Sequence, residues 1–553
     1  MARWTHRAWP VAALAAAATT ATTPGLSAQR TRDPATAVIV TGGEPSLPVP
    51  TLMDGPLNNQ GNTDIADQLF LHLAELGPTM MTAGDRAFVP ALARSWTRRD
   101  SVTLVFELDP RATWHDGVPV TARDVVFTFE RARNPAIAPT LAGVLRHITE
   151  VKAEGERQVV FRYDRPYGEQ LYDAVFHVAP IPAHLLAALP PDSLARSPFA
   201  RAPIGSGAYR WVRQVPGEFV ELAANERFFL GAPAVRRVIF RVAKDADARL
   251  NLVLSGEADM MDNIPPPRDN VARVSAQPRV RIIPFPSPTV GYLLFNQRDP
   301  RDTTRPHPIL SDLDVRRAIG LALDRRQMVR ATFGTAGDVP FGPASAVMLW
   351  IRHGAMPVRP DVPRARKLLS GRGWSDHDGD GTLDRDGVPL ALTLLTTNTS
   401  AVRFQLAQQA QEQLRQIGIR LAIDRRDFPL YNQERGAGRF DLDFASATLD
   451  PSPSGLTQSW TCEGPTNVAR FCDPAVDSLL DLAQRTGDRA AETYQAVLRR
   501  IESDAPAVFM YAPSYLAIVD RRFGNVRIRP ESLWLALREW TVTGKGSGRS
   551  SGR

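Results

Sequence analysis

The sequence predicts an α/β protein of several domains, because strand and helix patterns follow one another along a chain of ordinary globular composition. The chain has 553 residues, of which 43% are hydrophobic and 23% are charged, as in typical globular domains. The part that follows a predicted N-terminal leader is long enough for two to four domains. The pattern is clearest between residues 91 and 133, where a strand, a turn and a helix follow in order.

Residues 91–133 combine an apolar alternation, a tight turn and a helix start. The turn is predicted at 115–117, where a His-Asp-Gly triplet interrupts the pattern. Thr121 and Asp124 have the spacing of a capping box, in which each side chain accepts a hydrogen bond from the other's backbone N–H, so a helix is predicted to start there. The strand before the turn is predicted from apolar residues at alternate positions, Leu104, Phe106 and Leu108.

The same signals predict further elements along the chain. A helix is expected to begin near Leu313, with Ser311 and Asp314 as its capping box. Gly205 and Gly207 are expected to flank a sharp backbone reversal. Two proline-rich stretches, 265–267 and 284–288, are expected to be extended linkers. Strands are expected over 148–163, with a turn at 154–155, and over 291–296, and helices over 181–189, 361–369 and 400–417 and after Asp473 and Asp488.

The N-terminus has the pattern of a secretory signal peptide. Arg3 and Arg7 precede an apolar run over residues 8–18, and small residues follow up to Ala28. The run is shorter than the roughly 20 apolar residues that span a bilayer. We therefore expect cleavage after Ala28 and a periplasmic protein without a lipid anchor, because the first cysteine is Cys462. The tail over 544–553 is expected to be disordered.

The net charge of +7 raises the question of a nucleic-acid partner. The arginines are scattered among acidic residues, whereas a nucleic-acid interface needs a basic stripe with stacking aromatic residues. The composition therefore argues against nucleic acid. Cys462 and Cys472 are the only cysteines, and an isolated pair ten positions apart in an exported chain predicts a disulfide.

An acidic string between residues 376 and 387 has part of a calcium-loop pattern. Asp376, Asp378 and Asp380 have the ligand spacing of such a loop, with Asp384 close behind. The twelfth position, which needs a bidentate Glu, is Gly387. Two interpretations follow, a weak calcium site or a polar turn, and the missing ligand favours the turn. We expect no other metal site and no cofactor.

Four strings in order resemble the extracellular solute-binding proteins of family 5, the receptors of peptide and nickel ABC importers. The resemblance extends from about Asp64 to Trp540. It implies a periplasmic-binding-protein-like fold in which three domains form two lobes around a ligand cleft. The strings are LARSW with WHDGVPVTARDVVF at 92–127, PIGSGAYRWV with NERFFLGAP at 203–233, DVRRAIGLALDR at 314–325 and FDLDFASATLDPSP at 440–453.

The resemblance also implies the division of the chain into domains. Domain II is expected to be a single segment and domain I to be assembled from three. The expected segments are 1–28 signal peptide, 29–75 domain I (first part), 76–200 domain II, 201–288 domain I (second part), 289–504 domain III, 505–543 domain I (last part) and 544–553 tail.

The function implied by the resemblance is that of an exported receptor for an ABC importer. Such a receptor binds a peptide or another small solute between its lobes and delivers it to a membrane permease with its ATPase. We expect a monomer that contacts the membrane complex only peripherally. No paired nucleophile and base stands out, so an enzyme is not predicted. An exported hydrolase with an unrecognised active site remains an alternative, as does a sensing or chaperone-like accessory on the same fold.

The ligand contacts are predicted from the string at 440–453. In peptide receptors, an Asp four residues before the proline pairs with the α-ammonium group of the peptide, but Ala447 holds that position here. Asp450 is either a substitute for this anchor or a turn cap. Arg316 and Arg317 are expected to be structural or exposed residues. The other candidate ligand contacts are Asn62, Thr63, Phe341, Ser446, Thr448 and Trp460, and the last follows a polar loop beside the cysteine pair.

Overall fold

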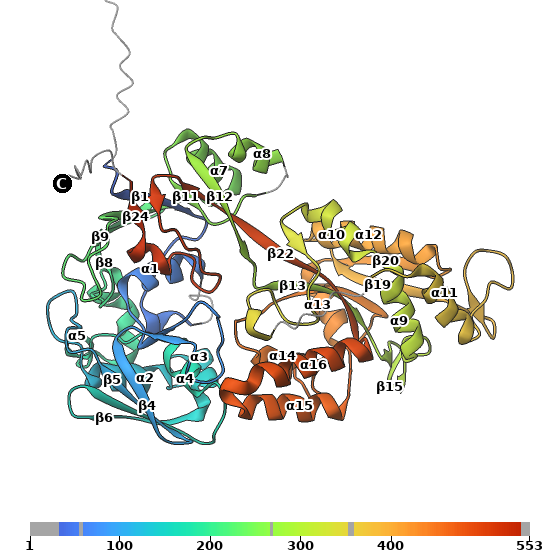
Figure 1. Ribbon diagram of the computed structural model, residues 1–553, viewed down its shortest axis with the longest axis horizontal. Helices are drawn as coiled ribbons and strands as arrows, with labels where there is room; N and C mark the ends of the chain where they lie inside the picture. The colour runs from blue at the N-terminus through green and yellow to red at the C-terminus, as the bar shows by residue number, and fades with distance from the viewer. Residues whose placement is uncertain (1–32, 55–58, 266–268, 352–358, 544–553) are drawn as a thin grey trace, which may run out of the picture. The chain divides into compact units, whose positions relative to one another are not determined.

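The structure, a computed structural model, describes residues 33–54, 59–265, 269–351 and 359–543 (Figure 1). The predicted signal peptide and the predicted disordered tail lie outside these residues. Among the described helices, none has both the length and the apolar character needed to cross a bilayer.

The largest sheet has twelve strands in the order β20-β19-β21-β13-β22-β11-β1-β10-β9-β8, and β12 and β16 also pair with β22. Strand β1 is parallel to β10 and β11, and β19 is parallel to β20 and β21; the other pairings of this sheet are antiparallel. The strands are β1 (Thr36–Thr41), β8 (Tyr209–Val215), β9 (Phe219–Ala224), β10 (Arg237–Val242), β11 (Met260–Met261), β12 (Val280–Pro286), β13 (Thr289–Phe295), β16 (Gly337–Asp338), β19 (Ala391–Thr397), β20 (Arg420–Arg426), β21 (Leu442–Thr448) and β22 (Ala507–Asp520).

Strand β22 belongs to two lobes. Its residues 507–511 pair with β13, whereas residues 514–520 pair with β12. The buried hydrophobic clusters divide at the same place. Two clusters consist of residues before 286 and after 516, and the other two consist almost entirely of residues 293–511. We call residues 34–286 and 514–543 the first lobe and residues 289–511 the second lobe. The chain passes between them only at 287–288 and 512–513.

Smaller sheets and helices complete both lobes. The four-stranded sheet of the first lobe has the order β4-β5-β7-β6. Its strands are β4 (Ala93–Asp100), β5 (Thr103–Leu108), β6 (Ile148–Glu154) and β7 (Gln158–Tyr163). The two-stranded sheets are β2 (Ala74–Leu76) with β3 (Phe88–Pro90), β14 (Arg298–Asp299) with β15 (Asp302–Pro306), β17 (Asp384–Arg385) with β18 (Val388–Pro389), and β23 (Phe523–Gly524) with β24 (Thr541–Val542).

The helices fall into two sets of eight among the described residues. Those of the first lobe are α1 (Gln60–Leu69), α2 (Ala122–Ala132), α3 (Pro139–Val144), α4 (Gln170–Val175), α5 (Ala183–Leu186), α6 (Pro198–Arg201), α7 (Ala246–Ser255) and α8 (Asp269–Ser275). Those of the second lobe are α9 (Leu313–Ala322), α10 (Arg325–Phe333), α11 (Val362–Gly371), α12 (Ala401–Arg415), α13 (Phe428–Gly436), α14 (Ser454–Trp460), α15 (Pro474–Arg485) and α16 (Ala490–Asp504).

The strand, turn and helix predicted between residues 91 and 133 are confirmed. Strand β5 buries its apolar side chains, and Gly117 makes the turn with a φ of 91°. The capping box of Thr121 and Asp124 begins α2, whose Val125 and Phe129 are buried in the core of the first lobe. Local sequence signals were sufficient here because each contact in the turn and the cap joins residues near in sequence.

Two local predictions are wrong in detail. Residues 284–286 are not a linker but the end of β12, which pairs with β22. Proline is tolerated in β12 because β22 is its only described partner strand, so the other edge of β12 needs no ladder hydrogen bonds. Helix α9 is capped by Asp312, whose carboxylate accepts from the backbone N–H of Asp314, while Ser311 donates to the carbonyl of His307. Asp312 is therefore the cap because it is one residue closer to the helix.

Gly205 and Gly207 are required for a reason other than the one predicted. Neither has a positive φ. A Cβ atom at Gly205 would collide with the carbonyl oxygen of Leu69, and one at Gly207 with the carbonyl oxygen of Gln68. The glycines thus permit close approach of two backbones, and this follows from the packing of the segment against the end of α1.

Candidate functional site

Two cavities lie on either side of the segment that follows β21. The first cavity has a volume of about 500 Å³ and the second about 450 Å³. Residues of the first lobe line the first cavity with one exception, Asp450, and residues of the second lobe line the second cavity. Asp450 lines both, so one exposed carboxylate marks the place where the cavities meet across the two lobes.

The first cavity has two compensated ion pairs in its wall. Both carboxylate oxygens of Glu75 accept from Arg538, each at 2.8 Å. Arg529 pairs with Glu531 and donates to the carbonyl of Leu76 at 2.6 Å. Burial raises the pKa of Glu75, but the guanidinium of Arg538 outweighs the effect of burial and brings the pKa of Glu75 below its ordinary value. These pairs connect β2 with the C-terminal segment of the chain and are structural contacts.

Asp67, on α1, is a carboxyl of the first cavity that lacks such a partner. The hydroxyl of Ser532 donates to it. Among the described residues, no cation forms an ion pair with Asp67. Burial raises the pKa of Asp67 to about 7, and the neighbouring carboxylates Glu75 and Glu531 add to the effect. Near neutral pH, the first cavity therefore contains a carboxyl group that is poised between its charged and neutral forms.

The second cavity has a compensated pair of its own. Arg435, on α13, contacts Asp443 with 2.6 Å between Nε and Oδ2, and the hydroxyl of Tyr431 donates to Oδ1 of the same carboxylate at 2.8 Å. Asp443 is completely buried in β21. Burial raises the pKa of Asp443, and Arg435 and Tyr431 offset only part of that increase. This pair holds α13 against the sheet and supports the cavity wall.

Arg403, on α12, is the cation of the second cavity that has no ion-pair partner among the described residues, and Asp450 is a carboxylate there that has none. Its Nη2 donates to the hydroxyl of Ser446 at 2.7 Å. Within the described part of the chain, no carboxylate lies within ion-pair distance of Arg403. Phe428 lines the same cavity with half of its side chain exposed. The second cavity thus offers a guanidinium, a hydroxyl and an aromatic surface to a solute.

The structure brings some of the predicted ligand residues together. Ser446, Ala447, Thr448 and Asp450 line the second cavity, and Thr63 lines the first with Asp450.

Two other predicted ligand residues line neither cavity. Asn62 is buried, and its side-chain oxygen accepts from the backbone N–H groups of Ser46 and Leu47 at 2.8 and 3.2 Å, so it holds a loop in place. Phe341 is partly buried and lines neither cavity.

Trp460 was predicted to stack on a ligand, and the structure corrects this. Only 5% of it is exposed, and its ring packs in the core of the second lobe. The ring centroids of Tyr292, Phe509 and Phe471 lie 6.4, 5.7 and 6.4 Å from it. The indole is directed inward because α14 packs this face onto β13 and β22, which sequence spacing could not show.

Apart from Asp450, sequence reasoning missed the charged residues of both cavities. Asp443 gave a signal, since it is a charged residue within the apolar string of β21 and such a residue is buried only with a partner. Asp67 gave none, because its partner Ser532 is 465 positions away in the chain. Arg316, in contrast, behaves as predicted for a structural arginine, because it is buried and donates to the backbone carbonyls of Leu310 and Ala505.

The predicted disulfide is confirmed. Cys462 and Cys472 are bonded to each other between α14 and α15. The carboxylate of Asp477, on α15, accepts from the backbone N–H of Cys462 at 3.1 Å. The bridge therefore closes a local loop in the second lobe, beside the core that contains Trp460.

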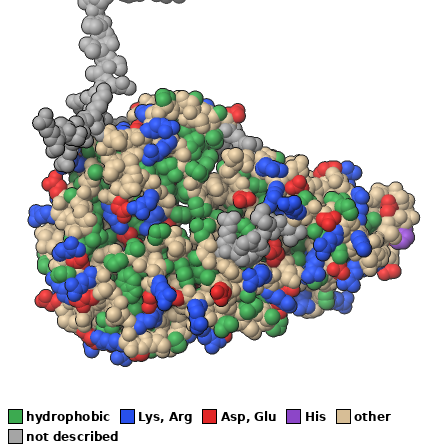
Figure 2. Space-filling model, in the orientation of Figure 1, with side chains coloured by type: hydrophobic (Ala, Val, Ile, Leu, Met, Phe, Trp, Pro, Cys, Tyr) green, Lys and Arg blue, Asp and Glu red, His purple; other side chains and the backbone are tan. Residues whose placement is uncertain are grey.

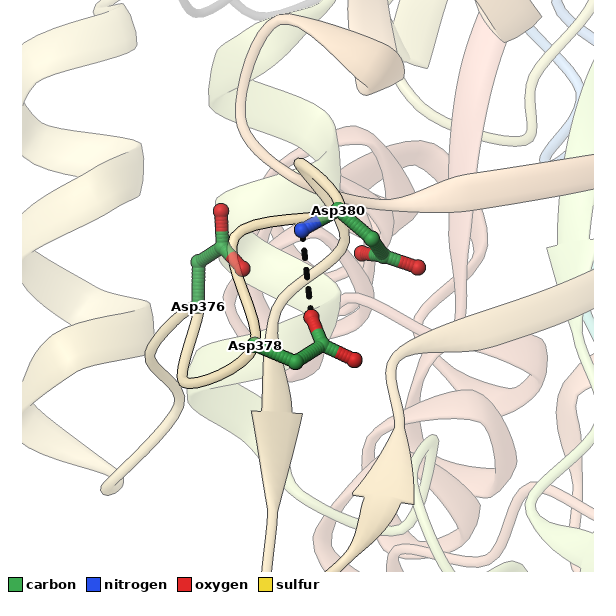
Figure 3. Close-up of side chains that lie close together, drawn as sticks. All are labelled: Asp376, Asp378 and Asp380. Carbon is green, nitrogen blue, oxygen red and sulfur yellow. Dashed lines mark hydrogen bonds between the residues drawn. The ribbon is translucent and has the colours of Figure 1, made fainter.

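The acidic string forms an exposed turn before β17 (Figure 3). Ligand oxygens of Asp376, Asp378 and Asp380 lie within 4.8 Å of one another. Asp384 contacts the ring of His377 at 2.8 Å. Backbone N–H groups of the turn donate to these carboxylates. Those of Gly379 and Gly381 donate to Asp376, that of Asp380 donates to Asp378, and that of Thr382 donates to the side chain of Asp380. The turn is thus stabilised by its own carboxylates, and the expectation of a polar turn without calcium stays a prediction.

The surface carries charges of both signs. On the face drawn in Figure 2, basic and acidic side chains are interspersed over both lobes and are not gathered in one stripe. This distribution agrees with the sequence, in which the arginines lie among acidic residues.

Comparisons with known proteins give a consistent result. The sequence profile of the bacterial extracellular solute-binding proteins, family 5, middle region, matches residues 87–468. A putative ABC transporter peptide-binding protein of Brucella ovis is 29% identical over 443 residues, which cover 77% of this chain and 79% of the relative.

Solved structures have the same fold. The oligopeptide-binding protein AppA of Bacillus subtilis, in complex with a nonapeptide, matches with a TM-score of 0.66 and 23% identity, over 92% of this chain and 99% of that chain. NikA of Brucella suis, in complex with Fe(III)-EDTA, matches with a TM-score of 0.74 and 19% identity, over 92% and 100% of the two chains.

Proposed function

The chain belongs to family 5 of the bacterial extracellular solute-binding proteins, and on that premise we propose that it is the exported receptor of an ABC importer. In this role it binds a small solute between its lobes and presents the closed form to a membrane permease with its ATPase. The relatives named as peptide-binding proteins of ABC transporters support this assignment.

The observation that carries the proposal is the position of Asp450. It is a residue of the second lobe, yet it lines the cavity of the first lobe as well as that of the second. A solute that contacts both lobes biases their equilibrium toward the closed arrangement. Because the chain crosses between the lobes only at 287–288 and 512–513, such a motion needs few backbone changes.

The charges of the site limit the class of solute. Arg403 favours a carboxylate or another anionic group in the second cavity, because a charge-assisted hydrogen bond to guanidinium is strong and directional. Ala447 provides no partner for an ammonium group, and Asp450, the carboxylate that borders both cavities, is exposed, so an ion pair with it contributes little. We therefore expect ordinary dipeptides to bind poorly and anionic solutes to bind better, since a buried cation without a partner costs several kcal/mol.

A thermal-shift screen tests the function. Dipeptides, longer peptides, sugars and metal chelates should be compared, because a solute at 100 times its dissociation constant stabilises the native state by about 2.7 kcal/mol. The variant Ala447→Asp should gain affinity for peptides, and Glu226→Gln, an exposed carboxyl change, should leave all affinities unchanged. If no solute class shifts the melting temperature, the receptor function is contradicted. Micromolar binding of dipeptides by the unaltered protein would contradict the ligand class alone.

Export and domain organisation complete the proposal. We propose a mature N-terminus near Gln29 and the three-domain division predicted from the sequence, in which the first lobe contains domain II and domain I except for the start of its last part, since residues 505–511 lie in the second lobe. Intact mass after periplasmic expression tests the N-terminus, and an uncleaved Met1 end would contradict it. Native-state hydrogen exchange tests the division, because the backbone amides of each domain should be protected as one unit.

A further inference from the structure

Besides the two chain connections, the lobes touch at a third place, between residues 81–86 and 168–169 of the first lobe and residues 452 and 484–488 of the second. In Figure 1, α15 and α16 approach α4 here. The backbone N–H of Gly168 donates to the carbonyl of Gln484 at 2.5 Å, and that of Asp85 to the carboxylate of Asp488 at 3.1 Å. We call this place the lobe junction.

The lobe junction is packed closely. Ala83, although it belongs to the first lobe, is buried in a hydrophobic cluster of the second. A Cβ atom at Gly84 would collide with the side chain of Asp488. These contacts join the two lobes, so a separation of the lobes at the junction would break them.

Glu169 is the titratable group at the centre of the lobe junction. It immediately precedes α4 and accepts from the hydroxyl of Thr82 at 2.5 Å within its own lobe. Its other oxygen accepts from the hydroxyl of Ser452 at 2.9 Å across the junction. Ser452 is buried, lines the second cavity and lies two residues after Asp450. Glu169 is therefore connected to the wall of the ligand site by one hydrogen bond.

The surroundings of Glu169 are acidic and aromatic. Asp173 faces it from its own lobe and Asp450 from the other, and no cation in the described chain forms an ion pair with it. The phenols of Tyr167, Tyr172 and Tyr494 complete the set of titratable groups around it. Burial, with a contribution from the two carboxylates, raises the pKa of Glu169 from 4.5 to about 7.

We propose that Glu169 is a positioning residue of the ligand site, which holds the segment around Asp450 and Ser452 in place only when the lobes are closed. The role deepens the proposed receptor function and rests on it. In the closed protein, the carboxyl keeps Ser452 in the wall of the second cavity and Asp450 at the border of the two cavities. When the lobes separate, the hydrogen bond to Ser452 is lost and Glu169 is rehydrated.

The direction of the pH dependence follows from linkage. A carboxyl with a higher pKa in the closed form takes up a proton on closure, so low pH favours the closed form. The contribution is complete below pH 4.5 and is lost as the pH rises through about 7. In the open form, Thr82 and other residues of the first lobe already shield part of the Glu169 carboxyl from water, so closure adds only part of the increase in its pKa. We therefore expect the ratio of closed to open protein to be about threefold higher, or more, at pH 5 than at pH 8.

Distances between two spin labels test the proposal without any solute. Val212→Cys in β8 and Val388→Cys in β18 place labels on exposed positions of different lobes, and both native cysteines are occupied in the disulfide. The labelled protein should show the closed distance more often at pH 5 than at pH 8. Glu169→Gln keeps an oxygen acceptor without a charge, so it should stay closed at both pH values. Glu169→Ala should be more open at both.

The control and a second variant keep the test decisive. Glu226→Gln changes an exposed carboxyl elsewhere in the first lobe and should retain the wild-type pH dependence. Ser452→Ala removes the same hydrogen bond from the other lobe and should open the protein as Glu169→Ala does, with little further effect when the two are combined. The proposal is overturned if Glu169→Ala closes like the wild type, or if Glu169→Gln retains the pH dependence. Because no solute is present, a failed solute screen would contradict the receptor function and leave this result intact.

Discussion

The two cavities use charge in opposite ways. Each has a compensated pair in its wall, Glu75 with Arg538 in the first cavity and Asp443 with Arg435 in the second. Asp450 borders both cavities, and each cavity also has a charged group of its own that lacks an ion-pair partner among the described residues, which differs in sign between the two. The first cavity has a carboxyl, Asp67, and the second has a guanidinium, Arg403.

The difference separates structural from functional charges. A compensated buried pair contributes to the position of its elements, and removal of one partner leaves the other buried without compensation. A charge without a partner is instead available to a solute. The comparison therefore predicts that changes in the pairs reduce stability, whereas changes in the free groups alter binding or pH response. The variants below are ordered from the largest expected effect to the smallest.

Arg538→Met should cause the largest loss of stability. It leaves Glu75 buried without its guanidinium, and breaking a buried pair in this way costs about 3–5 kcal/mol. Urea unfolding measures the loss. Arg236→Met, at an exposed pair with Glu226, is the matched control and should change stability by less than about 1 kcal/mol. A loss below about 1 kcal/mol for Arg538→Met would remove the distinction between structural and functional charges in the first cavity.

Cys462→Ser should destabilise the second lobe without changing the fold. The loop is short, and the chain-entropy estimate for its closure is about 3 kcal/mol. The melting temperature should fall while the far-ultraviolet circular dichroism spectrum is retained, because most of the core lies outside this loop. Alkylation of the unreduced wild type provides the control and should find no free thiol. An unfolded variant would show that the bridge supports the whole second lobe.

Arg403→Gln should weaken binding with little effect on stability. Loss of a charge-assisted hydrogen bond corresponds to about 1.5–3 kcal/mol, or roughly ten- to a hundredfold in affinity for an anionic solute. N-acetyl-trialanine and its C-terminal amide form a matched pair of probes in calorimetry, since neither has an ammonium group and only the first has a carboxylate. The wild type should prefer the acid and the variant should not. Equal affinities for both probes in the wild type would show that the second cavity does not select for an anion.

Asp67→Asn should raise stability at alkaline pH. Because burial raises the pKa of Asp67 to about 7, its contribution is present below its unfolded pKa near 4 and is lost as the pH rises through 7. The variant should therefore match the wild type near pH 4 and exceed it at pH 8 by on the order of 1–2 kcal/mol. Denaturation curves at the two pH values measure this. A variant that is less stable at pH 8 would indicate that the ionised carboxylate is compensated in the folded protein.

The acidic turn should show the smallest effect. The carboxylates of Asp376, Asp378 and Asp380 already accept hydrogen bonds from backbone N–H groups of the turn. Gly387 occupies the twelfth position, where a calcium loop has its bidentate Glu. EDTA or added calcium should thus shift the melting temperature by less than about 1 °C. A reversible shift of several degrees with calcium would identify the turn as a metal site.

The sequence by itself determined the features that depend on near neighbours. The strand, turn and helix between 91 and 133 and the disulfide of Cys462 with Cys472 were predicted because the patterns that mark them, an apolar alternation, a capping box and an isolated cysteine pair, are local in the sequence. The family was predicted from ordered strings, and the profile match over residues 87–468 shows it. Proline composition misled the prediction for β12, because its pairing with β22 is a contact between residues over 200 positions apart.

Only the tertiary structure decided which charges are compensated. Arg538 and Glu75 are 463 positions apart, and Glu169 and Ser452 are 283 positions apart. No local pattern marks such partners, because burial and long-range packing choose them. The same reason explains Trp460, which is an aromatic residue beside a polar loop in sequence and a core residue in space. Composition and spacing thus specify the elements, whereas the site depends on how the two lobes bring distant side chains together.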